Sequence, residues 1–258
     1  MSAAAVGLAK PHWLRRPAPL RAGTALLAAL SLWACAGAAD AARDRGPGAA
    51  LATAPSAVRV LDAGLLRYLA QPAHALPPLD GVPGANPVTT CEQLVGAFRA
   101  GMEPGELRER PAFAAWSDCL AGALIARGQG IASGALDLEN AGQRIFQDLD
   151  LASVPSSLAP RRPADHYHLS DFSFVTQRIE PLAVRLESDS FDYAFEILAT
   201  GDFRRDGHAA WLVRLTDHAK AGSYAMKTLL LVAPRQPGSA LIATDAIELL
   251  IGPPTGRH

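Results

Sequence analysis

FDYAFEILATGDFRRDGHAAWLVRL (residues 191–215) consists of two runs of alternating apolar and polar residues, joined by the turn GDFRRDG. The apolar positions of the runs are Phe191, Tyr193, Phe195 and Ile197, then Trp211, Val213 and Leu215. A period of two is typical of a strand that buries one face. The stretch therefore predicts an antiparallel hairpin. In its register Glu196 lies near Arg214, and the two are expected to form a cross-strand ion pair on the outer face.

Strand patterns continue on both sides of this hairpin. The further predicted strands are residues 182–188, 227–234, 240–250 and, more weakly, 166–175. Residues 227–234 are nearly all apolar, which is typical of a central strand. The turns between the runs are short, which favours antiparallel neighbours in chain order. We therefore expect an antiparallel β region over residues 156–252.

Residues 58–155 show helical periodicity instead. The predicted helices are residues 58–70, a helix that starts at a capping box of Thr89 and Glu92, a helix from Pro111 to Gly128, and residues 137–149. The second and third are joined by a short link, which favours an antiparallel helical hairpin. The fold class expected is α+β, with an N-terminal helical part followed by an antiparallel β-sheet.

The chain has three cysteines, Cys35, Cys91 and Cys119. In the predicted helical hairpin, Cys91 and Cys119 lie at similar heights and on inward faces. A disulfide between them would close a loop of about 30 residues and stabilise the fold by about 3 kcal/mol. The alternative is two buried free thiols. No C-x-x-C motif is present, so the sequence does not indicate a zinc knuckle or a thioredoxin-type site.

The N-terminal segment is typical of an export signal. A basic leader precedes the uncharged residues 22–34, whose length fits a signal peptide and is too short for a membrane helix. LWAC (32–35) resembles the bacterial lipobox, which implies lipidation at Cys35, although Trp33 is bulky for its position. Cleavage near Ala39 is the alternative. We expect residues 1–34 to be a signal peptide, residues 35–57 a flexible tether, and the product a periplasmic or outer-membrane lipoprotein.

The charge balance argues against nucleic acid as a partner. The chain has 24 basic and 25 acidic residues, and residues 1–34 hold four of the basic residues and no acid. The chain from residue 35 therefore has 20 basic and 25 acidic residues, a net charge of −5. A phosphate-binding surface requires a basic surplus.

The turn GDFRRDG (201–207) resembles the calcium loop of FG-GAP and related integrin-type repeats, whose pattern is G-D-F-N-G-D-G-x-x-D. The matching residues are Gly201, Asp202, Phe203, Asp206 and Gly207. The sequence departs from the pattern where Arg204 replaces an oxygen ligand, Arg205 replaces a glycine and Ala210 replaces the late carboxylate. A calcium loop needs the oxygen ligands at positions 204 and 210. We therefore expect a degenerate loop without metal or cofactor, pinned by Asp202 and Asp206, with Arg204 as an internal counter-charge.

The surrounding stretch, 199–233, resembles the C-terminal part of exported bacterial proteins of unknown function, which implies no particular activity.

Two groups of residues are candidates for chemistry. His166 and His168, with Asp165 or Asp171, form half of a possible metal site, or a solvated start of a strand. Glu187, Asp189 and Asp192 form an acidic cluster that could hold a cation or serve as a carboxylate pair, or that is simply a solvated turn. No G-x-S-x-G, S-x-x-K, H-E-x-x-H or P-loop motif occurs.

These observations favour an exported, lipid-anchored cell-envelope protein with a binding or structural role. Its partners are then the membrane, through the anchor, and an envelope protein. The alternatives are an envelope hydrolase that uses strand-end carboxylates, and an inhibitor or partner module for another envelope enzyme. A cleft lined by Glu187, Asp192 and a histidine would favour the hydrolase. A flat apolar strand edge would favour the partner module.

Overall fold

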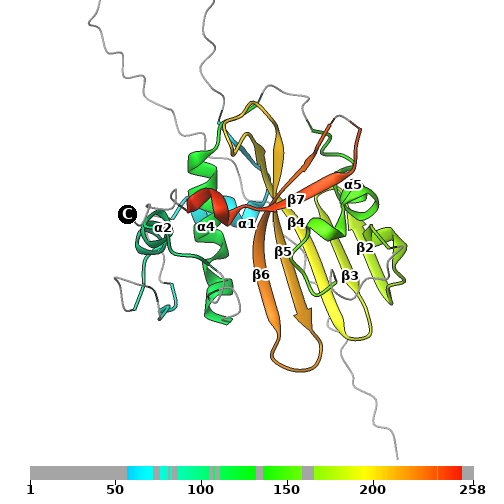
Figure 1. The fold of residues 1–258 in the computed structure, drawn as a ribbon, viewed down its shortest axis with the longest axis horizontal. Coiled ribbons are helices and arrows are strands. Elements are labelled where there is room, and N and C mark those ends of the chain that lie inside the picture. Colours follow the sequence, from blue (N-terminus) through cyan, green and yellow to red (C-terminus); the bar gives the residue numbers. More distant parts are fainter. Residues whose placement is uncertain are drawn as a thin grey trace, which may run out of the picture. The chain divides into compact units, whose positions relative to one another are not determined.

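The computed structural model contains one antiparallel sheet with helices on both faces (Figure 1). It describes residues 57–71, 76–80, 82, 87–104, 107, 111–131, 136–158, 166–236 and 238–251. The predicted signal peptide, Cys35 and all but the last residue of the predicted tether lie outside these residues. In the described part of the chain, the α+β fold class is confirmed.

The sheet is a meander, because strands β2 to β7 lie side by side in chain order. Its strands are β2 (Thr176–Glu180), β3 (Ala183–Glu187), β4 (Phe191–Gly201), β5 (Ala210–Ala219), β6 (Ala225–Pro234) and β7 (Leu241–Asp245). The short β1 (Arg59–Val60) pairs with β4 next to Ala199 and Thr200. The predicted helical region therefore also contributes a strand to the sheet.

The predicted hairpin is confirmed as β4 and β5. Phe195 pairs with Leu215 and Glu196 with Arg214, as the alternation predicts. A bulge between Ile197 and Ala199 then shifts the register by one residue. A bulge changes which side chains face each side of the sheet. As a result, Leu198 and Ala199 both join the core on the face opposite to Ile197.

Each face of the sheet has its own core. We call one the α5 face, because α5 (Ala141–Asp148) packs on it with the short 3₁₀ helices Leu151–Ser153 and Leu169–Asp171. Its core includes Phe195, Trp211, Val213, Leu215, Leu230 and Val232. The other we call the helical-layer face, because α1 (Ala63–Leu69), α2 (Cys91–Arg99) and α4 (Ser117–Arg127) share its core with Leu212, Leu229 and Leu231.

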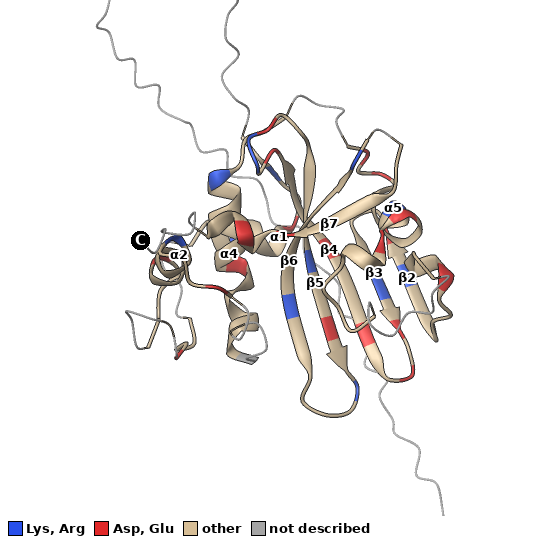
Figure 2. Ribbon diagram, in the orientation of Figure 1, with Lys and Arg blue, Asp and Glu red and all other residues tan. Residues whose placement is uncertain are grey.

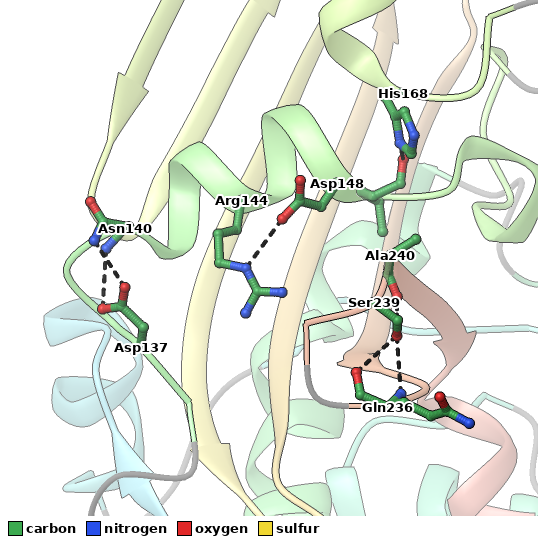
Figure 3. Close-up of polar contacts among 9 residues, drawn as sticks. Asp137, Asn140, Arg144, Asp148, His168, Gln236, Ser239 and Ala240 are labelled. Carbon is green, nitrogen blue, oxygen red and sulfur yellow. Dashed lines mark hydrogen bonds and ion pairs between the residues drawn. The ribbon is translucent and has the colours of Figure 1, made fainter.

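The capping box of α2 differs from the predicted one by one position. The Thr90 side chain accepts the backbone N–H of Gln93, and the Gln93 side chain accepts the N–H of Thr90. The predicted pair, Thr89 and Glu92, was wrong because Gln93 can take the carboxylate's role. The helix predicted over 137–149 begins in the structure at Ala141, after a turn in which Asp137 accepts a bond from the Asn140 amide (Figure 3).

Four other predicted segments differ from the structure. The predicted helix 58–70 divides into β1 and α1, because the Asp62 carboxylate caps a helix that starts only at Ala63. The helix predicted from Pro111 begins as the 3₁₀ helix Pro111–Trp116 and becomes α-helical at Ser117. Residues 166–175 contain a 3₁₀ turn and no strand, since the Asp171 carboxylate accepts the N–H groups of two residues before it. The strand predicted over 240–250 ends at Asp245, whose carboxylate accepts the N–H of Ile247 and starts the 3₁₀ helix Ile247–Leu250.

Candidate functional site

The turn GDFRRDG is organised around one buried carboxylate. Asp202 is only 5% exposed, and its two oxygens accept the backbone N–H groups of Arg205, Asp206 and Gly207 at 2.6, 3.2 and 2.7 Å. Arg205 and Gly207 adopt positive φ angles of 62° and 84°. Backbone donors thus surround the Asp202 carboxylate, and the loop is held closed by its own main chain.

The expected role of Arg204 as an internal counter-charge is wrong. Its guanidinium is exposed and donates to the Thr244 hydroxyl on β7 at 2.5 Å. Three neutral N–H groups already satisfy Asp202, so its charge needs no cationic partner inside the loop. Asp206 contributes differently from Asp202, because its carboxylate accepts the N–H of His208 at 3.0 Å and remains exposed.

The same turn is attached to the end of α4. Asp202 and Gln129 exchange two backbone hydrogen bonds of 2.7 and 2.9 Å. The Arg205 side chain donates to the carbonyl of Arg127, the last residue of α4, at 2.8 Å. A cationic donor is favourable at the C-terminus of a helix. The turn therefore joins the β4–β5 hairpin to the helical layer.

The predicted disulfide joins Cys91 and Cys119, with 5.6 Å between their Cα atoms. Cys91 is the first residue of α2, and Cys119 lies in the first turn of α4. Cys119 is buried, whereas Cys91 is partly exposed. The bond fixes α2 to the helix that packs on the sheet.

The helical layer covers only one end of its sheet face. At its border, Arg214 on β5 donates to Glu196 on β4 at 3.1 Å and to Asp118 on α4 at 2.5 Å. The predicted Glu196–Arg214 pair is confirmed, but it does not lie on an outer face. Arg185 on β3 joins the same cluster by donating to Glu196 at 2.8 Å. These ion pairs mark the line at which the apolar core ends.

Beyond that line, the sheet carries an open cleft of about 460 Å³ on β2 to β5. We call it the open-face cleft. Its polar side chains are Thr176, Arg178, Arg185, Glu187, Asp192, Thr216 and His218. Figure 2 shows charged residues of both signs along these strands. The cleft exists because the helices stop short of this end of the sheet.

Strand register places like charges next to each other in the open-face cleft. Arg178 on β2 pairs with Arg185 on β3. Two residues further along β3, Glu187 pairs with Asp192 on β4, whose neighbour on β5 is His218. Such cross-strand pairs of like charge weaken a sheet. The cleft therefore presents a cationic row, whose Arg178 and Arg185 are each also paired with a glutamate, beside an acidic row. The rows are about 7 Å apart, which corresponds to two residues of strand rise.

Lys220 offsets one of the two negative charges of the acidic row. The Lys220 ammonium is paired with Glu187 and lies 3.9 Å from the Asp192 carboxylate. The hydrogen bond from Lys220, together with one from Thr176 and the lysine's charge, lowers the pKa of Glu187. A general acid needs the opposite, a carboxyl whose pKa is raised. The arrangement holds Glu187 as an anion and suits ligand binding.

The histidines predicted as half of a metal site have structural roles. The His168 ring lies 3.2 Å from the carbonyl of Leu149 (Figure 3), and its backbone N–H donates to Asp171 at 2.8 Å. His166 packs edge-on against Phe172, with ring centroids 5.0 Å apart. Asp165 lies outside the described residues. Within the described residues, no group of three or more His, Cys, Asp or Glu is placed to hold a metal ion.

Sequence reasoning missed half of the open-face cleft. It identified Glu187, Asp189 and Asp192, and only Glu187 and Asp192 line the cleft. Arg178 was missed because β2 has a single large apolar residue, Ile179, so its strand pattern is weak. A better signal is the tight turn at Pro181 and Leu182, which makes residues 176–180 the partner of the predicted strand that follows.

The comparisons with known proteins give no family assignment. No helix in the described part of the chain has both the length and the apolar character needed to cross a membrane. Comparison of the chain with family models, with curated proteins and with solved structures gave no match in any of the three.

Proposed function

We propose that this protein is an exported binding module, anchored in the cell envelope by a lipid on Cys35, that holds a protein partner in the open-face cleft. The observation that supports binding is the pair of oppositely charged rows on an uncovered half of a sheet. Such a surface is complementary to a segment that carries one cation and one anion about 7 Å apart. Two residues of an extended partner chain span this distance.

The location is supported by the sequence and is compatible with the disulfide. A basic leader, a short apolar run and LWAC (32–35) form the expected order of a lipoprotein signal. The Cys91–Cys119 bond joins two helices in a core, and structural disulfides persist in oxidising compartments. Mass spectrometry of the N-terminal peptide tests the anchor directly. An acylated Cys35 is expected, and a free N-terminus near residue 40 would contradict it.

A hydrolase is the second candidate, because Glu187, Asp192 and His218 line the same cleft. Lys220 argues against a general-acid role for Glu187, because it lowers the pKa of that carboxyl. The two functions differ in one measurable property. A hydrolase releases soluble fragments from envelope material in a manner that depends on Glu187, so wild type and Glu187→Gln are compared. No release above background from either protein supports the binding module.

Binding in the cleft can be tested with a photo-crosslinking residue at Ala194, which pairs with Arg185 and continues the arginine row onto β4. The matched control places the same residue at Gln147, an exposed position on α5. We expect a discrete protein adduct from position 194 alone. Arg178→Glu with Arg185→Glu should abolish it by reversing the cationic row. The same adduct from both positions, or none from position 194, contradicts the proposal.

A further inference from the structure

A second cavity lies at the opposite end of the β4–β5 hairpin and shares no residue with the open-face cleft. It has a volume of about 250 Å³ and is formed by the GDFRRDG turn, the end of β6 and β7. We call it the turn cavity. Its size lies just below the usual range of about 300–1,000 Å³ for small-molecule sites, so it admits a short ligand.

The floor of the turn cavity is apolar. Phe203 and Leu231 are almost fully buried, and Ala233 and Ile242 are partly exposed beside them. Apolar surface of this kind favours a hydrocarbon group over water. The apolar floor does not distinguish one class of ligand from another, so the charged residues of the rim determine which class can bind.

The rim carries a surplus of positive charge. Arg204 and Arg235 lie along it, beside the His208 ring and against the single carboxylate of Asp206. Asp206 already accepts the N–H of His208. Arg204 uses one nitrogen to bind Thr244, which fixes the side chain over β7 and leaves its other N–H groups available. Arg235 has no hydrogen-bond or ion-pair partner among the described residues.

We propose that the turn cavity binds a small monocarboxylate with a short hydrocarbon chain. The guanidinium groups of Arg204 and Arg235 would hold the carboxylate, because planar guanidinium matches its two oxygens. The hydrocarbon chain would lie on Ala233 and Ile242, which pack over the buried Phe203 and Leu231. In the calcium loops that this turn resembles, position 204 supplies a cation ligand. Here an arginine stands at that position, and its positive charge favours an anion where the calcium loop holds a cation.

The test is an NMR titration of the full chain, as cells process it, with hexanoate as the probe. Amide shifts of Ala209 and Thr244, which line the cavity, report binding. Acetate lacks the hydrocarbon chain and hexylamine lacks the anion, so both are expected to bind at least tenfold more weakly. Arg204→Gln and Arg235→Gln should each weaken hexanoate about tenfold, as expected for loss of a charge-assisted hydrogen bond.

Matched variants distinguish binding in the turn cavity from nonspecific attraction to positive charge and from loss of folding. Arg67→Gln removes an exposed arginine on α1, outside both cavities, and should bind hexanoate like wild type. Ala233→Leu narrows the floor and should weaken hexanoate more than acetate. Circular dichroism checks that each variant is folded. The proposal is overturned if hexanoate shows no saturable binding, if acetate binds as tightly, or if the two arginine variants bind like wild type.

Discussion

Arg214 and Asp118 lie 96 positions apart in the chain, and the Arg214 guanidinium donates to the Asp118 carboxylate at 2.5 Å. Arg214 is 14% exposed and also binds Glu196, so one cation serves both a strand and a helix. This contact is where the helical layer ends and the open-face cleft begins.

Replacing Arg214 by Met should lower the free energy of unfolding by about 1–2 kcal/mol, because two partly buried carboxylates lose their shared cation. Urea unfolding measures the change. Arg178→Met is the control, since the Arg178–Glu180 pair is largely exposed and should contribute almost nothing. Equal effects of the two variants would show that the border cluster has no special role.

The closed turn predicts a calcium-independent protein in which Asp202 is essential for stability. Asp202→Ala leaves three backbone N–H groups without their acceptor, and we expect a loss of about 2 kcal/mol. Asp206→Ala removes an exposed acceptor of one bond and should cost less. Thermal melting with calcium and with chelator should give the same midpoint. A rise of several degrees with calcium would contradict this account.

Removal of the disulfide should destabilise the fold without changing it. The double variant Cys91→Ser, Cys119→Ser loses a cross-link between residues 28 apart, which corresponds to about 3 kcal/mol. Guanidinium unfolding of wild type, with and without reductant, provides an internal comparison. Reduced wild type and the double variant should unfold alike, and a stability unaffected by reductant would refute the prediction.

Two helical glycines should respond in opposite ways to alanine. A Cβ on Gly142 would lie 2.0 Å from the backbone oxygen of Glu180, so Gly142→Ala must push α5 away from the β2–β3 turn. A Cβ on Gly96 meets nothing within 4 Å, and Gly96→Ala should stabilise α2 by about 0.5–1 kcal/mol. Thermal unfolding of the two variants shows the contrast. Stabilisation by Gly142→Ala would mean that α5 is not packed as described.

The pH dependence of stability should include Glu187. Its folded pKa is lower than its unfolded value, about 4.5. The stabilisation is therefore complete above that pH and is lost as the pH falls through the folded pKa. In Lys220→Met the Glu187 pKa should rise, as followed by carboxyl NMR. Lys227→Met is the control, because no contact of Lys227 with Glu187 occurs among the described residues. Equal titrations in both variants would exclude Lys220 as the cause.

The parts of the fold that were predictable depend on local patterns. The β4–β5 hairpin has a period of two and a glycine-containing turn, and the two cysteines fall at matching heights on neighbouring helices. The bulge at Ile197 and Ala199 has no such local signal, since both residues are apolar. Nor could the sequence show which end of a sheet face the helices would leave open. That outcome depends on where α4 packs, and it determines the open-face cleft.

The positions of Cys91 and Cys119 also have a consequence for synthesis. Both lie before the first residue of β2, so both leave the ribosome before the six strands of the meander have been synthesised. In an oxidising compartment, the covalent ring can close on the emerging chain. The helical layer is then already cross-linked when the later strands are synthesised. The apolar half of one sheet face can therefore be covered as soon as it forms, which shortens the time that it is exposed to solvent.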